Sequence, residues 1–158
     1  MSDGGLSGQY AAAVYGSILV TGLIGSLRYD EDARTIVLTV LGTSAVFWLA
    51  HVWSELLAHR IETGQLVGWS RVRRVAAVEW PMIEAGILPV VAVALAWAGV
   101  YSVRAGTNVA LVVAIGQLVA WTLVAALRSG LGRAKSIAFA LLDGLLGLGI
   151  VALELALH

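Results

Sequence analysis

The chain lacks cysteine and carries little charge, and each absence excludes a class of protein. With no cysteine among its 158 residues, it has no disulfide framework, no thiolate metal or iron–sulfur site and no cysteine nucleophile. Charged residues make up only 13% of the chain, whereas a soluble domain carries about 25%. Ten Lys and Arg balance ten Asp and Glu, so the chain lacks the basic excess that binds nucleic acid. A glycine-rich phosphate loop and an exposed Ser-His-Asp arrangement are also missing, which argues against an enzyme.

Hydrophobic residues dominate instead, at 59% of the sequence with a mean hydropathy of +0.89. A domain of this size leaves a large fraction of its surface exposed. The composition therefore excludes a water-soluble globule and predicts that the outer surface contacts lipid. Residues 1–9 lack the basic region and cleavage site of a signal peptide, so we expect the first apolar segment to be retained.

Five apolar stretches are long enough to cross a bilayer as helices, which takes about 20 residues each. They are continuously apolar and do not alternate with a period of two, which favours helices over strands. We therefore expect a single all-α membrane domain over residues 1–158, a bundle of five transmembrane helices. The predicted spans are 10–27, 35–57, 75–101, 107–127 and 136–157.

The positions of Lys and Arg predict the orientation, because cytoplasmic loops hold an excess of these residues. The link after the second span holds four arginines, and the link after the fourth span holds three cations. The cations on the opposite side are Arg28, Arg34 and Arg104. We therefore expect a multi-pass protein of the cytoplasmic cell membrane, with its N-terminus inside and its C-terminus outside.

Six ionisable side chains fall inside the predicted spans, where a charge exposed to lipid would be costly. Such residues usually face the interior of a helix bundle or a wet cavity. With a rise of about 1.5 Å per residue, five of them lie in the cytoplasmic half of the bilayer, and Glu154 lies apart near the outer end. The five that could share one site are His51, Glu55, Glu79, Glu84 and Asp143.

These five residues predict a site for a divalent metal ion or a path for protons. His51 and Glu55 are four residues apart and share a helix face, so an imidazole and a carboxylate could ligate one cation or pass a proton between them. A proline at position 81 would free a backbone carbonyl near Glu79 and Glu84, and such oxygens suit a hard cation. Further polar groups that could line a pathway are Ser54, Met82, Gln117 and Glu154.

Structural roles explain several of the same residues. His51 could be a hydrogen-bonded structural histidine, and Glu79 could form an interfacial ion pair with Arg73 or Arg74. Gln117 could hold helices together by a hydrogen bond. Met82 could be a filler of the helix interface.

Small residues recur at the spacing of helix contacts in the first and last spans, where they let helix backbones approach closely. This close approach could serve packing within one protomer or a seam between two copies. We expect the lipid bilayer and a second copy, as a homodimer, to be the partners, with no nucleic acid. The small residues are Ser17, Thr21, Gly25, Gly144, Gly147 and Gly149.

Several patches resemble the vacuolar iron transporter family. They are Thr-Gly-Leu-Ile-Gly at 21–25, Ile-Val-Leu-Thr at 36–39, Ala-Gly-Ile-Leu-Pro at 85–89 and the stretch 125–149. The resemblance implies five membrane helices, a cytosolic N-terminus, a homodimer and transport of iron or a similar metal.

The chain also departs from that family at its metal ligands. Residues 10–16 hold no acid where the family's first helix has a ligand aspartate, and His51 and Val52 stand near the place of a ligand methionine. The family's cytosolic metal-collecting helices are reduced to the loop at 60–74.

Three functions of different kinds follow from these observations. The first is a cation transporter or channel for a divalent metal such as iron or manganese, or one coupled to protons, with flux that depends on Glu84 and Asp143. The alternative is a non-catalytic membrane scaffold or partner subunit whose buried acids pair with His51 and with one another, and which shows no flux. A third is an intramembrane enzyme that uses His51 and a carboxylate as acid and base.

Overall fold

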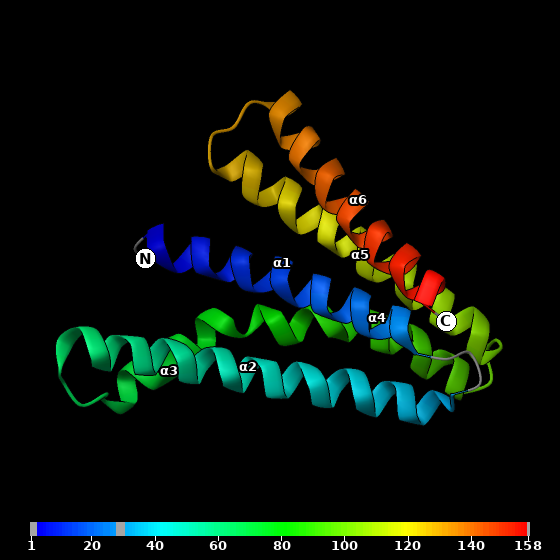
Figure 1. The fold of residues 1–158 in the computed structure, drawn as a ribbon, viewed down its shortest axis with the longest axis horizontal. Coiled ribbons are helices and arrows are strands. Elements are labelled where there is room, and N and C mark those ends of the chain that lie inside the picture. The colour runs from blue at the N-terminus through cyan, green and yellow to red at the C-terminus, as the bar shows by residue number, and fades with distance from the viewer. Residues whose placement is uncertain (1–2, 28–30, 158) are drawn as a thin grey trace.

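The computed structural model describes residues 3–27 and 31–157, except for the side chains of residues 3–5, 154, 155 and 157. Every regular element in these residues is a helix (Figure 1), which confirms the all-α prediction. In chain order the helices are α1 (Asp3–Ser26), α2 (Ala33–Thr63), α3 (Trp69–Glu79), α4 (Pro81–Trp97), α5 (Val103–Arg128) and α6 (Arg133–Leu157).

Three of these helices are long and apolar enough to cross a membrane: α2, α5 and the part of α6 up to Leu153. The pair α3 and α4 passes the same test together but is bent by 40°, so it counts as a fourth candidate if it forms one span. Their outward faces carry exposed apolar side chains such as Val46, Leu88, Val112 and Leu145. A membrane protein is therefore supported, with three to four candidate spans where the sequence predicts five.

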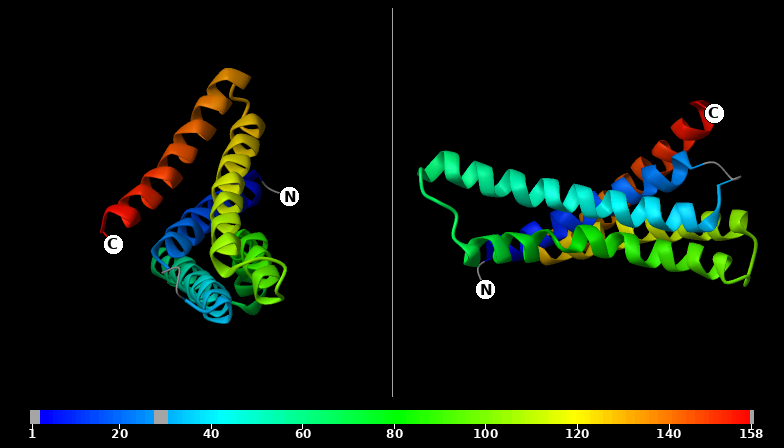
Figure 2. Two further views of the ribbon diagram at one scale, coloured as in Figure 1. Left: turned by 90° about the vertical axis from the view of Figure 1, so that its right-hand side faces the viewer. Right: turned by 90° about the horizontal axis from the view of Figure 1, so that it is seen from below.

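The helix α1, predicted as the first span at 10–27, is not among these candidates. Glycine, serine, threonine and glutamine lower its hydropathy. These residues suit its position, because α1 contacts all five other helices and lies between the α2–α4 layer and the α5–α6 pair (Figures 1 and 2). It is the most central helix of the bundle, and its neighbours cover much of its surface, with Ala11 and Tyr15 among its exposed residues.

The polar side chains in the middle of α1 are satisfied within the helix itself. The buried hydroxyl of Ser17 donates to the carbonyl oxygen of Ala13 at 2.8 Å, and that of Thr21 donates to the carbonyl oxygen of Ser17 at 2.7 Å. No water is needed for either group, so both can be buried among apolar neighbours.

An apolar core fills the half of the bundle that contains the C-terminal end of α1. Its residues come from the second half of α1, the first half of α2, the second half of α4 and the first half of α5. They are Val20, Ile24, Ala33, Ile36, Val40, Ala92, Val93, Ala110 and Ala114.

Two local features set the shape of the α2–α4 layer. Gly64 ends α2 with a left-handed φ of 65°, and its N–H donates to the carbonyl oxygen of Arg60 at 2.9 Å. The break between α3 and α4 falls at Trp80, directly before Pro81, which has no N–H to continue the helix. Pro89 lies inside α4 without interrupting it, so only the first of the two prolines of the chain coincides with a break between helices.

The small residues of α6 pack within the chain. A Cβ atom at Gly144 would lie 3.1 Å from the side chain of Val119, and one at Gly147 would lie 3.4 Å from Ile115, both on α5. A Cβ atom at Gly149 would meet nothing within 4 Å. Two of the three glycines thus serve packing inside one protomer, and the dimer stays a prediction.

Gly16 sets the approach between α1 and α4 and provides the first testable prediction. A Cβ atom there would lie 2.6 Å from the carbonyl oxygen and 2.8 Å from the Cα atom of Met82. Because both atoms belong to the backbone, Gly16→Ala must push the helices apart. We expect the free energy of unfolding to fall by about 1–3 kcal/mol, the usual cost of overpacking.

The matched control is Gly42→Ala, because a Cβ atom at Gly42 would meet nothing within 4 Å. Alanine favours a helix over glycine by about 1 kcal/mol, so this variant should keep or gain stability. Thermal unfolding in detergent compares the two variants. Equal stability of Gly16→Ala and the wild type would contradict the close approach.

Candidate functional site

The structure does not assemble the five predicted metal ligands into one site. Within the described residues, no group of three or more His, Cys, Asp or Glu side chains is placed to hold a metal ion. The five divide among separate helices: His51 and Glu55 on α2, Glu79 at the end of α3, Glu84 on α4 and Asp143 on α6. The bound metal ion stays a prediction.

Three of these groups lie near one another between α2 and α3. Glu79 is half-buried and interacts electrostatically with both His51 and Glu55. The His51 ring lies 4.7 Å from the Tyr15 ring, and its Nδ1 is 3.0 Å from the carbonyl oxygen of Phe47. His51 therefore has the hydrogen bond and ring contact of a structural histidine, one of the two roles that the sequence allows.

Trp48 ties α2 to α3 beside the same groups. Its indole N–H donates to the carbonyl oxygen of Ala76 at 3.1 Å, and its ring meets that of Trp80 edge to face at 5.8 Å. This contact holds the two helices together directly before the break at Pro81.

The remaining predicted residues are dispersed. Glu84 is exposed on α4, and Ser54 is exposed on α2. Met82 is fully buried as a core residue, and the side chain of Glu154 lies outside the described residues. Gln117 on α5 has a buried Oε1 atom with no hydrogen-bond partner, so its amide oxygen is an open acceptor inside the bundle.

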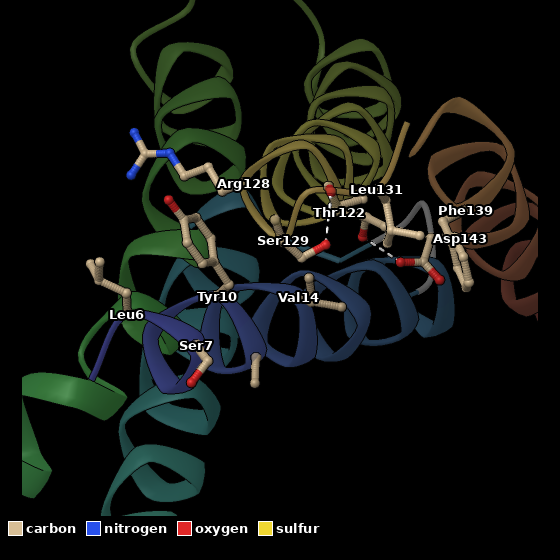
Figure 3. Close-up of a pocket in the computed structure, with 13 residues that line it drawn as sticks. Leu6, Ser7, Tyr10, Val14, Thr122, Arg128, Ser129, Leu131, Phe139 and Asp143 are labelled. Carbon is tan, nitrogen blue, oxygen red and sulfur yellow. Dashed lines mark hydrogen bonds between the residues drawn. The ribbon is translucent and has the colours of Figure 1, made fainter. Parts of the chain in front are cut away.

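A cavity of about 630 Å³ lies between α1, α5 and α6 (Figure 3). Its walls are mainly apolar side chains, among them Leu6 and Val14 of α1 and Phe139 of α6. The cavity reaches Ser129 and Leu131 at the turn between α5 and α6. Its size is within the range of about 300–1,000 Å³ that is typical of small-molecule sites.

The α5–α6 pair diverges from α1 to form this space. Toward its C-terminal end α6 meets α1, where a Cβ atom at Gly22 would lie 3.5 Å from Ile150. Toward its N-terminal end α6 lies away from α1 (Figure 1). The cavity thus occupies one half of the molecule, and the apolar core of α1, α2, α4 and α5 occupies the other half.

Asp143 brings a carboxylate to the cavity wall. It is half-buried on α6, and its Oδ2 atom accepts a hydrogen bond from the Thr122 hydroxyl on α5 (Figure 3). No Lys, Arg or His among the described residues forms an ion pair with it. A carboxylate oxygen pair accepts several hydrogen bonds, so a single bond from the protein leaves acceptor positions free for a cation beside it.

The side chain of Arg128, a cation in the cavity lining, contacts Tyr10 and does not approach Asp143. Its guanidinium carbon lies 5.8 Å from the centre of the Tyr10 ring, which in turn lies 6.2 Å from the ring of Trp121. In Figure 3 the guanidinium points away from Asp143. Six residues separate Arg128 from Thr122 on α5, which is about 9 Å along the helix axis. The Arg128 charge is thus held at the edge of the cavity.

Sequence reasoning identified Asp143 but missed Tyr10, Thr122 and Phe139. The usable signal was the spacing of Phe139 and Asp143, which are four residues apart and so share one face of α6. The sequence gives no signal for Thr122 or Tyr10, because the role of each side chain depends on which neighbouring helix it contacts.

No family model matches the chain, and no similar curated protein or solved structure is found for it. The resemblance to the vacuolar iron transporter family therefore stays a prediction.

The hydrogen bond between Thr122 and Asp143 provides the second prediction, tested by a double-mutant cycle. Thr122→Val removes the donor and Asp143→Leu removes the acceptor. Because the acceptor is a carboxylate, we expect a coupling free energy of about 1.5–3 kcal/mol. Equilibrium unfolding of the wild type, both single variants and the double variant gives this value.

A parallel cycle with Thr107→Val in place of Thr122→Val is the control. The Thr107 hydroxyl donates to the carbonyl oxygen of Val103 within α5, so no coupling with Asp143→Leu is expected. Equal coupling in the two cycles would refute a specific bond between α5 and α6.

Proposed function

We propose that the protein is a cation transporter of the cytoplasmic membrane and that Asp143 is the carboxylate that binds the transported cation. One observation carries the proposal: an acid without an ion-pair partner lies in the wall of a cavity in one half of the bundle. The apolar core fills the other half. A site that is accessible from one side and closed toward the other is the arrangement that alternating access requires.

The position of the cations supports a cytoplasmic location for the cavity. The start of α1, the link at 64–68 and the link at 129–132 lie toward one end of the molecule (Figures 1 and 2). The predicted cytoplasmic Lys and Arg are in or beside these links, and the cavity lies near the turn at 129–132. By the positive-inside rule this end faces the cytoplasm.

We further propose that the chain crosses the membrane five times. In this topology α1 is an inner span shielded by its neighbours, and α3 and α4 form one bent span. The low hydropathy of α1 is tolerated there because Ser17 and Thr21 are buried and bonded to the α1 backbone.

The topology is tested with single cysteines, because the natural chain has none. Gln65→Cys lies in the link at 64–68, and Val100→Cys lies in the link at 98–102. In intact cells we expect a membrane-impermeant maleimide to label Val100→Cys and to leave Gln65→Cys unlabelled. Permeabilised cells, in which both should react, are the control. The reverse pattern, or equal labelling in intact cells, would contradict the orientation.

The transport proposal is tested by currents from proteoliposomes on a solid-supported membrane. Concentration jumps of protons, Mn²⁺ and tetraphenylphosphonium are applied in turn. We expect wild-type protein to give a current with at least one of them and Asp143→Asn to give none, because the amide cannot balance a positive charge. Glu62→Gln, which changes an exposed acid of α2 outside the predicted site in the same way, should keep the wild-type current.

Two outcomes would oppose transport through this site. A wild-type protein without current for every cation would favour the scaffold alternative. An unchanged current in Asp143→Asn would remove Asp143 from the pathway.

A further inference from the structure

We infer that the cavity between α1, α5 and α6 binds an amphipathic organic cation. Its single positive charge lies beside Asp143, and its apolar body lies against the cavity wall. The inference rests on the proposed function, because it names the class of cation that the same site would carry.

The size and the walls of the cavity favour an organic molecule. A space of about 630 Å³ is far larger than a single inorganic ion needs. An inorganic ion here would keep most of its water against apolar walls that include Leu6, Val14 and Leu131. A molecule with its own apolar surface would displace that water with a gain in free energy, so the walls select for hydrophobic bulk.

The ligand groups exclude a tightly held divalent metal. One carboxylate and one hydroxyl, from Asp143 and Thr122, supply the site. Protein sites supply four nitrogen, sulfur or oxygen ligands for structural zinc and six to eight oxygens for calcium. No group of acids and histidines in the described residues reaches even three. The site therefore suits a cation that does not need a full set of coordinating ligands.

Phe139 completes the recognition of an organic cation. It lies one helical turn before Asp143 on α6, and both side chains line the cavity (Figure 3). The Phe139 side chain is 51% exposed, which leaves it available to a ligand in the cavity. Substituted ammonium and phosphonium groups are held between an aromatic face and an anion, because the ring face is electron-rich. The pair Phe139 and Asp143 provides both.

Arg128 limits the ligand to one positive charge. Its guanidinium rests on the Tyr10 ring at the edge of the cavity, about 9 Å along α5 from Thr122. A second cationic group on the same ligand would be repelled there. The end of the ligand away from Asp143 is therefore expected to be uncharged.

The probe pair for the test is tetraphenylphosphonium and tetraphenylborate, which have nearly the same shape and opposite charge. Binding of radiolabelled tetraphenylphosphonium is measured on purified full-length protein in a neutral detergent. We expect saturable binding of tetraphenylphosphonium and no saturable binding of tetraphenylborate, each measured in separate samples because the two ions precipitate together. Asp143→Asn should weaken it by at least about tenfold, the value of one lost charged contact. Phe139→Leu, which removes the ring, should weaken it by about two- to fivefold.

Matched control variants and a second cavity variant distinguish a loss of the binding site from a general loss of folding. Glu62→Gln and Phe47→Leu change an acid and an aromatic ring outside the cavity, and both should bind as the wild type does. Ala11→Trp fills the cavity from an exposed position on α1 and leaves Asp143 in place. It should abolish binding even if Asp143→Asn fails to fold.

The failures of the two proposals are distinguishable. Wild-type affinity in Asp143→Asn or in Ala11→Trp, or saturable binding of tetraphenylborate in its own samples, overturns the inference. A current for protons or Mn²⁺ that depends on Asp143, without binding of tetraphenylphosphonium, overturns the inference and leaves the proposed function intact. No Asp143-dependent current with any cation, together with no binding, overturns both.

Discussion

Where water is excluded from the interior of a membrane protein, a polar group depends on the chain itself for hydrogen bonds, and this constraint distinguishes the helix interfaces from the cavity. Thr21 on α1 bonds to a carbonyl of its own helix, and Trp48 on α2 bonds to the carbonyl of Ala76 on α3. Asp143 has one donor, the Thr122 hydroxyl, for a group that accepts several hydrogen bonds. It is left partly unsatisfied in the wall of a cavity. The proposed chemistry of the protein follows from that imbalance.

The cavity itself results from unequal packing around α1. On one side, Gly16 brings the α1 backbone against the backbone of α4 at Met82, with no room for a Cβ atom. On the other side, α6 meets α1 near Gly22 and Ile150 and lies away from it at the opposite end (Figure 2). Small residues thus allow close packing of α1 against α4, whereas α1 packs against α6 at one end only. A cavity in one half and a dry core in the other half follow directly from this arrangement.

Much of the fold could be predicted from the sequence, because helix positions depend on the order of apolar and helix-breaking residues along the chain. Continuous apolar runs predict helices, and Pro81 predicts the break between α3 and α4, since it has no N–H for the helical bond. The inner position of α1 could not be predicted from hydropathy, because its small polar residues lower hydropathy and at the same time allow close packing. Hydropathy therefore does not distinguish a covered membrane helix from an interfacial one.

The candidate site was harder to predict, because the sequence gives the depth of a residue in the membrane but not the direction in which its side chain points. The predicted site grouped residues by their depth, whereas the rotation of each helix decides which way a side chain faces. Glu84 is exposed on α4, Asp143 lines the cavity, and His51 contacts Tyr15. These rotations arise from many contacts between small side chains on different helices. A pattern read along a single helix does not contain them.

The central claim is that water and cations reach the half of α1 beside Asp143 and not the half in the apolar core. Val14 lines the cavity and Val20 is fully buried in the core, so cysteines at these two positions sample the two halves of one helix. The most direct measurement is their rate of modification by a quaternary ammonium thiosulfonate and by an anionic thiosulfonate. The account predicts reaction at Val14→Cys alone, faster with the cationic reagent, and a loss of that preference when Asp143→Asn is added. Equal rates at the two positions, or a preference for the anionic reagent at Val14→Cys, would contradict it.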